Sequence, residues 1–265
     1  MPRGGLSSYP MISVVVCSVR PDRFARVCAH YESLLRSGPF EIVGIHDAES
    51  LCEGYNRGAA RAKGEILVFS HDDVEFLSTD LRSKVESRLG PGLDLIGVAG
   101  TTLLIDDMWA SAGMPHVCGQ VAHPWRGGGW EVGQWGTAAR VYTGVQAVDG
   151  LWFAATRRLW EASPFDEGTF DGFHLYDLDF SYSAWKAGFR LGVCADIAVI
   201  HESEGRFDDV WRGHAEKFRA KHSATLGSAR KRVGDVSVVA VRTKAEALEV
   251  MTPPHWSAWK AGARR

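Results

Sequence analysis

Apolar and polar positions follow one another in short blocks that predict strand, helix, strand, helix and strand over the first seventy residues. Residues 11–17 form a β-branched apolar run, which is typical of a central strand covered on both faces. A helix over 24–35, a strand over 41–46, a helix over 51–62 and a strand over 65–69 follow. This order predicts right-handed βαβ units in an α/β fold, with a mainly parallel central sheet and helices on both faces.

Polar turns follow each of these three strands, at Ser18–Asp22, His46–Ser50 and His71–Asp73. In parallel sheets, ligands bind beyond the carboxyl ends of the strands. We therefore expect the three turns to meet in one crevice.

Regular patterning continues beyond residue 77 with one long interruption. It predicts helices over 78–89, 157–162 and 177–186, and strands over 93–98, 148–155 and 193–200. These elements complete a domain that we assign to residues 11–222.

Residues 101–143 show no sustained period, so we predict a long Trp- and Gly-rich loop. It is either a packed loop or an acceptor platform, because sugar rings stack on indoles and glycines let a loop close. We favour the platform, with Trp125, Trp130 and Trp135 against the acceptor.

A C-terminal extension, 223–265, carries one predicted strand, 236–241, and one predicted helix, 244–250. It ends in a basic, Trp-containing stretch, 255–265. That stretch is either a solvated tail or a weak contact with a membrane surface.

Composition narrows the class of protein. The 265 residues are 45% hydrophobic and carry a formal charge of −2, so a basic footprint for nucleic acid is missing. The five cysteines are scattered without CxxC spacing, which favours neither disulfides nor a zinc finger and fits a reducing cytoplasm. No window reaches the ~20 apolar residues of a membrane helix.

The acids of the sequence His71-Asp72-Asp73 follow a buried strand directly. Carboxylates there lose solvation unless a cation pairs with them. Two interpretations stay open: the acids cap the next element, or they bind Mn²⁺ or Mg²⁺, which can bridge the phosphates of a nucleotide. No Walker loop or GxGxxG is present to grip phosphate instead.

Asp177 and His201 each have a structural and a functional interpretation. Asp177 opens a helix, either as a cap or as a general base whose pKa is raised by aromatic neighbours. His201 follows a strand, either as a structural residue or as a third metal ligand. A zincin is disfavoured because His-Glu-x-x-His is absent.

An ordered series of segments resembles the family 2-like glycosyltransferases with the GT-A fold, over about 12–205. The series comprises ISVVVCSVR, YNRGAARAKGEILVFSHDDVEF, VDGLWFAATRRLWE, FDEGTFDGFHLYDLDFSYSAWKAGFRLG and the strand that leads to His201.

The resemblance implies roles for individual residues. Asp73 matches the last Asp of the DxD motif, a metal ligand, and His71 stands in place of the first. Asp177 matches the Asp of the ED motif, the base of an inverting transferase, with Tyr176 in place of Glu. His201 matches a histidine that some members use as a metal ligand. The remaining expected residues, which would bind the nucleotide-sugar, are Ser18, Arg20, Asp47, Asn56 and Asp72.

The implied function is metal-dependent transfer of a sugar from a UDP, GDP or dTDP sugar to a glycan or other hydroxyl acceptor. Asp177 would deprotonate the acceptor, and Arg20 or Arg206 would add positive charge at the diphosphate. One alternative is a catalytically silent domain that binds a nucleotide-sugar or a protein partner. A second, a nucleotidyltransferase, lacks the basic glycine-rich loop expected after the first strand.

Overall fold

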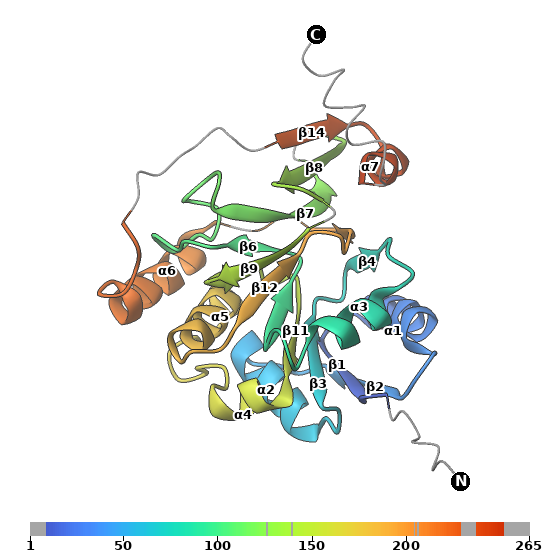
Figure 1. The fold of residues 1–265 in the computed structure, drawn as a ribbon, viewed down its shortest axis with the longest axis horizontal. Coiled ribbons are helices and arrows are strands. Elements are labelled where there is room, and N and C mark those ends of the chain that lie inside the picture. The colour runs from blue at the N-terminus through green and yellow to red at the C-terminus, as the bar shows by residue number, and fades with distance from the viewer. Residues whose placement is uncertain are drawn as a thin grey trace.

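A computed structural model describes residues 9–125, 127–138, 140–203, 205, 207–228 and 237–251 (Figure 1). The strands are β1 (Ile12–Cys17), β2 (Phe40–Ile45), β3 (Ile66–Ser70), β4 (Val74–Phe76), β5 (Leu95–Gly97), β6 (Ala99–Thr101), β7 (Val117–Pro124), β8 (Trp130–Trp135), β9 (Val141–Val145), β10 (Ala147–Val148), β11 (Trp152–Thr156), β12 (Leu191–Cys194), β13 (Val199–His201) and β14 (Ser237–Val241). The helices are α1 (Pro21–Leu35), α2 (Leu51–Arg61), α3 (Leu81–Arg88), α4 (Arg157–Ala162), α5 (Tyr176–Lys186), α6 (Asp209–His222) and α7 (Lys244–Met251).

The central sheet has the strand order β2-β1-β3-β11-β5-β12-β9. Strands β1, β2, β3, β5 and β12 run in one direction, whereas β11 and β9 run antiparallel to their neighbours. The α/β class and the mainly parallel sheet predicted from the sequence are confirmed.

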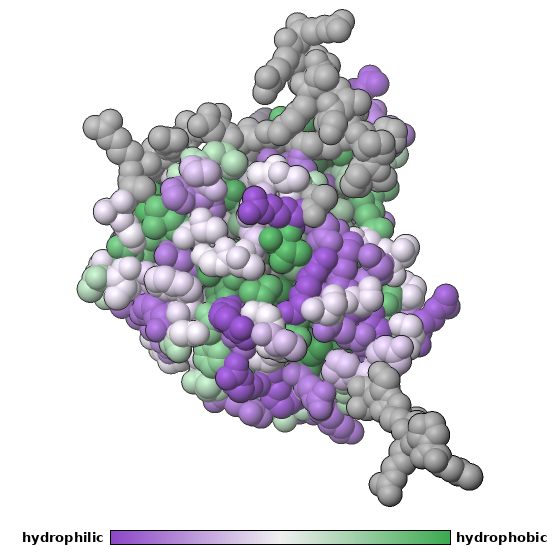
Figure 2. Space-filling model, in the orientation of Figure 1, coloured by the Kyte–Doolittle hydropathy of each residue, from purple (hydrophilic) through white to green (hydrophobic). Residues whose placement is uncertain are grey.

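Alternate residues of the central strands enter two separate hydrophobic cores. Val15 packs with residues of α2 and α5, whereas Val14 and Val16 pack with residues of α1 and α3. Helices therefore cover both faces, which explains why these strands are apolar at nearly every position (Figure 1). In Figure 2, hydrophilic residues cover the surface over α1 and α3, and hydrophobic surface shows near the middle of the same face.

A second sheet, with the order β10-β6-β7-β13-β4, corrects the prediction that 101–143 is a loop. Within that range β7 pairs with β8, and β9 begins. The sequence shows no alternation of apolar and polar residues here, because Gly119 within β7 has no side chain and because β7 is buried on both faces up to Ala122.

Two predicted single strands, 148–155 and 193–200, are each two short strands in different sheets, with breaks between β10 and β11 and between β12 and β13. The predicted strand 93–98 contains β5, and β6 follows it in the second sheet. Both halves of each divided strand are buried and apolar, so no polar signal marks the change of sheet. The break between β10 and β11 is a turn at Asp149-Gly150 that brings a carboxylate toward the cavity described below.

The described part of the C-terminal extension belongs to the second sheet. β14 pairs antiparallel with β8, and α7 adds Ala247, Val250 and Met251 to a third hydrophobic cluster. The predicted strand and helix of the extension are confirmed. The predicted boundary after residue 222 does not mark a separate unit, because β14 continues the second sheet. The predicted tail, 255–265, lies outside the described residues. None of the helices in the described ranges has the length and apolar character required to cross a bilayer.

Candidate active site

Three predicted metal-binding side chains converge where the two sheets meet. His71 Nδ1 lies 3.1 Å from His201 Nε2, and His201 Nε2 lies 3.3 Å from a carboxylate oxygen of Asp73. One potential ligand atom from each residue lies within 4.8 Å of the others. The sequence thus predicted a cluster that the fold assembles from residues 130 positions apart.

Backbone hydrogen bonds hold the strand ends that carry this cluster. The His71 N–H donates to Leu151 O at 3.1 Å, and the Glu202 N–H donates to Asp73 O at 2.9 Å. Since β13 also pairs antiparallel with β4, His201 stands opposite Val74 in the ladder. The cluster is therefore built on rigid elements, as a site of defined geometry requires.

The pKa values of His71 and Asp73 in this cluster are both lowered. Burial and, after it, the neighbouring His201 together lower the pKa of His71 to about 4, so His71 is neutral. Burial opposes ionisation of Asp73, but the hydrogen bond and charge of His201 outweigh it and hold the Asp73 pKa well below its usual range. Two imidazole rings beside one ionised carboxylate make a ligand set that suits a divalent ion, whose binding displaces protons from the ligands.

Asp177 is the second residue of α5 and is directed into a neighbouring cavity. Burial, followed by the negative charge of Asp149, raises the pKa of Asp177 to about 7. Asp177 does not hold the N-cap position, which belongs to Leu175. Its carboxylate still accepts backbone hydrogen bonds from Gly150 and from Asp177 and Leu178 at the helix start, which partly offset the rise in its pKa. Leu175 has φ of 61°, alone among the described non-glycine residues, and such strain often marks a functional site.

A second acid on the same helix shows the contrast. Asp179 is buried, and its Oδ1 lies 2.8 Å from Lys221 Nζ and 2.7 Å from His222 Nε2. The ion pair with Lys221 therefore balances its charge. In the described part of the chain no ion pair involves Asp177. The two acids of the Asp-Leu-Asp sequence therefore serve different purposes, one structural and one exposed to a cavity.

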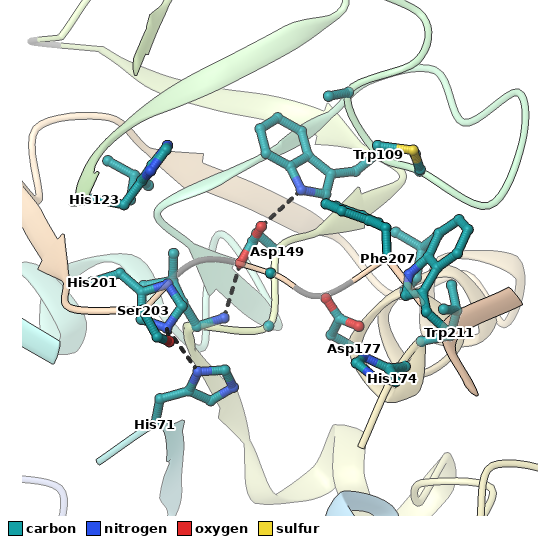
Figure 3. A pocket seen from close by; sticks show the side chains of 18 of the residues that line it. His71, Trp109, His123, Asp149, His174, Asp177, His201, Ser203, Phe207 and Trp211 are labelled. Carbon is teal, nitrogen blue, oxygen red and sulfur yellow. Dashed lines mark hydrogen bonds between the residues drawn. The ribbon is translucent and has the colours of Figure 1, made fainter. Parts of the chain in front are cut away.

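The cavity beside Asp177 has a volume of about 630 Å³ and lies between the cluster of His71, Asp73 and His201 and a set of aromatic side chains. Figure 3 shows His71 and His201 on one side, Asp177 and Asp149 in the middle, and Phe207 and Trp211 on the other side. The tryptophan, phenylalanine and tyrosine residues that line the cavity are Trp109, Trp125, Trp135, Phe173, Tyr176, Phe207 and Trp211. The Trp109 Nε1–H donates to Asp149 at 2.8 Å, which fixes both side chains.

Comparison with known proteins identifies the family. Residues 13–227 match a family described as glycosyltransferase-like. The chain belongs to this glycosyltransferase-like family. No curated protein matches the sequence significantly.

Solved structures of glycosyltransferases are similar in fold. Mannosyltransferase PcManGT from Pyrobaculum calidifontis, in complex with GDP-Man and Mn²⁺, is 14% identical with a TM-score of 0.50, over 97% of this chain and 74% of that one. GalNAc-T7 with UDP, GalNAc and Mn²⁺ is 16% identical with a TM-score of 0.46, over 75% of this chain. The match spans 45% of the GalNAc-T7 chain. The expected family 2-like glycosyltransferase with a GT-A fold is confirmed.

Beside the cluster, two predicted nucleotide-binding residues contact each other. Ser18 donates to Asp72 at 2.5 Å, which links the end of β1 to the end of β3. Arg23, which the sequence did not single out as a site residue, lies 3.3 Å from Asp73 and 3.7 Å from Asp72. The sequence signal that could have indicated Arg23 is its place in the first turn of α1, directly after the polar turn that follows β1.

Three other predicted nucleotide-binding residues are engaged elsewhere. Arg20 is exposed and pairs with Asp22 at 3.0 Å, and Asp47 pairs with Arg57 at 2.9 Å. The Asn56 amide donates to Phe165 O and to Glu167 and accepts from Trp160 and Phe165, so it holds the segment after α4. Nucleotide binding by Asn56 stays a prediction, and its amide is occupied by these partners. Arg206 lies outside the described residues.

Two of the three predicted acceptor tryptophans, Trp130 and Trp135, lie on opposite faces of β8. Trp135 lines the cavity with Glu131, while Trp130 packs with the third hydrophobic cluster. Residues 130 and 135 differ by an odd number, so their side chains point to opposite faces of the strand. Trp130 is therefore removed from the predicted acceptor set, and Trp125 and Trp135 remain.

Sequence reasoning missed several cavity residues. Asp149 was visible only as an acid before an apolar strand, and Trp109 and Trp211 belong to segments far apart in the chain. No local pattern joins them, because the tertiary fold alone brings β10, α6 and the 102–116 segment together.

Proposed function

We propose that this glycosyltransferase transfers a sugar from a nucleoside-diphosphate sugar to an acceptor hydroxyl, with inversion at the anomeric carbon. The observation that carries the proposal is a carboxylate, Asp177, whose pKa is raised to about 7 on the wall of a cavity that His71 and His201 also line. A group that titrates near neutral pH is matched to accept a proton from a hydroxyl during attack.

In the proposed reaction Asp177 takes the acceptor proton while the acceptor oxygen forms a bond to the anomeric carbon. The bond from that carbon to the diphosphate oxygen breaks, and the electron pair leaves with the nucleoside diphosphate. Asp149 acts on this step indirectly, because its charge disfavours ionisation of Asp177 and so strengthens it as a base.

The donor diphosphate is proposed to lie at the strand ends that carry His71, Asp73 and His201. These residues would hold Mn²⁺ or Mg²⁺, which would supply positive charge to the leaving group. Arg23 contacts both Asp72 and Asp73 and adds a cation on the same side. The PcManGT complex with GDP-Man and Mn²⁺ agrees with a donor of this type.

The acceptor is proposed to be a sugar that lies in the aromatic part of the cavity. Trp125, 45% exposed, and Trp211 offer indole surfaces on which the C–H face of a pyranose can stack. Asp177 lines the same cavity and lies near Trp211 and Phe207 (Figure 3), so a stacked sugar presents a hydroxyl to the base.

The experiment is a thermal-shift panel followed by an assay. UDP, GDP and dTDP are added with Mn²⁺ and without it, and one nucleotide should raise Tm only with the ion. The matching nucleotide-sugar should then release diphosphate in the presence of a glycan acceptor. No Tm response to any nucleotide contradicts donor binding. A response without release under any acceptor favours the binding-only domain, which the unusual His71 and Tyr176 would then explain.

A further inference from the structure

The two positions at which the sequence departs from the family pattern touch each other. His71 Nε2 lies 2.8 Å from the hydroxyl oxygen of Tyr176. Tyr176 is buried, 4% exposed, and its ring packs against Tyr55 at 5.7 Å between centroids. The hydroxyl is therefore held in place by the core and is not free to turn away from His71.

Counting protons around this hydroxyl sets the state of the imidazole. The Tyr176 O–H donates to Gly150 O at 3.0 Å, so its single proton is used there. The hydroxyl oxygen then accepts from His71, and Nε2 of His71 carries the ring proton. Nδ1 consequently presents a lone pair, and it is Nδ1 that faces His201 at 3.1 Å.

Two lone pairs then face the ring nitrogen of His201, whose N–H is the hydrogen-bond donor to Asp73 and whose proton a bound metal ion would displace. His71 Nδ1 and an oxygen of Asp73 both approach His201 Nε2, and Ser203 Oγ lies 3.2 Å from the same nitrogen. Two ring nitrogens and a carboxylate at this separation hold a cation. Imidazole suits Mn²⁺, Co²⁺ and Zn²⁺, whereas Mg²⁺ prefers an all-oxygen shell and keeps its waters.

We propose that His71, Asp73 and His201 form a site that selects transition-metal ions such as Mn²⁺ against Mg²⁺, and that Tyr176 is the positioning residue that aims His71 Nδ1 at the ion. The inference rests on the proposed function and deepens it, since it chooses between the two metals and makes His71 a ligand.

The first test titrates the metal-free full chain with Mn²⁺ or Mg²⁺ alone, by calorimetry. Mn²⁺ should bind at least about tenfold more tightly than Mg²⁺. His71→Asp restores an oxygen ligand and should move that ratio toward Mg²⁺ by about tenfold. Equal affinities in the wild type, or an unchanged ratio in His71→Asp, would overturn the inference.

The second test looks for the nitrogen ligands directly. Electron spin-echo spectroscopy of the Mn²⁺-loaded chain should show coupling to two imidazole nitrogens, and His71→Asp should leave one. His123→Gln is the matched control, because His123 lines the same cavity but is not part of the cluster. Tight Mn²⁺ binding without nitrogen coupling overturns the inference and leaves the proposed transferase intact. No binding of either ion overturns the metal site in both.

The third test isolates the Tyr176 hydroxyl. Tyr176→Phe should weaken Mn²⁺ binding by about 10- to 100-fold, as loss of a group that orients a histidine ligand does. Tyr31→Phe is the matched control, because it removes a buried hydroxyl that bonds Ser70 at 2.7 Å, next to His71 in the chain but not on its ring. Equal Mn²⁺ affinity in Tyr176→Phe and wild type would overturn the positioning role, and so would an equal loss in both variants.

Discussion

The two walls of the cavity are built in different ways. The wall with His71, Asp73 and His201 consists of strand ends fixed by ladder hydrogen bonds. The aromatic wall draws on segments around Trp109, on β8, on α6 and on the turn before α5. The strand-end wall is thus rigid and can be predicted from the sequence, whereas tertiary contacts assemble the aromatic wall. The difference suggests that the first binds a ligand common to the family and the second sets the acceptor.

The largest expected effect tests the base that stands between the walls. Asp177→Asn should lower turnover by roughly 100- to 10,000-fold, because the amide cannot accept the proton. Donor binding, followed as a Tm shift with Mn²⁺ and nucleotide, should be retained. Wild-type turnover in this variant would remove Asp177 from the mechanism.

The same variant has a stability signature. An ordinary Asp titrates near pH 3.9, whereas Asp177 titrates at about 7, so folding opposes its ionisation between these values. The destabilisation is absent below pH 4, grows as pH rises and is complete above about 7. Asp177→Asn should therefore raise Tm at pH 8 by several degrees, on the scale of roughly 2–4 °C per kcal/mol, and leave it unchanged at pH 4. An equal Tm change at both pH values contradicts the raised pKa.

The next effect concerns the rigid wall alone. Asp73→Asn should abolish the Mn²⁺-dependent part of nucleotide binding, which at about 100 times Kd stabilises the wild type by about 2.7 kcal/mol. Asp80→Asn is the control, since Asp80 pairs with Lys84, is 56% exposed at its side chain and does not line the cavity. If both variants respond to nucleotide and Mn²⁺ as the wild type does, the diphosphate lies elsewhere.

The strand-end wall shows what a sequence alone can predict. Apolar runs that end in polar turns predicted β1, β3 and a strand that leads to His201. Asp73 and His201 meet because β13, in the second sheet, pairs antiparallel with β4, which begins directly after Asp73. The aromatic wall could not be predicted in this way. Trp211 on α6 and Trp109 carry no local signal of their contact with the cavity, and Trp130 misled because face assignment required the position of β8.

A smaller effect tests the aromatic wall. Trp125→Ala should raise the acceptor KM by about tenfold, the equivalent of one stacking contact, with donor binding unchanged. Trp130→Ala is the matched control on the opposite face of β8 and should lower Tm without changing the acceptor KM. A Trp125→Ala variant that loses donor affinity to the same extent would place the donor, not the acceptor, on this wall.

The smallest effect is a displacement of the pH profile. Asp149→Asn removes a charge that raises the Asp177 pKa, so the acidic limb of turnover should move to lower pH. Activity at pH 8 should change little, provided that the amide still accepts from the Trp109 indole. A limb that stays at the wild-type pH contradicts the coupling between the two acids.

The central claim is that one crevice joins a metal-bound donor to the base Asp177. A crystal structure with Mn²⁺ and the nucleotide chosen by the thermal-shift panel tests it most directly, with anomalous scattering to locate the ion. The account predicts an anomalous peak among His71, Asp73 and His201, with the diphosphate against it and Asp177 across the cavity. A peak elsewhere, with Asp73 directed away from both ion and nucleotide, would contradict it.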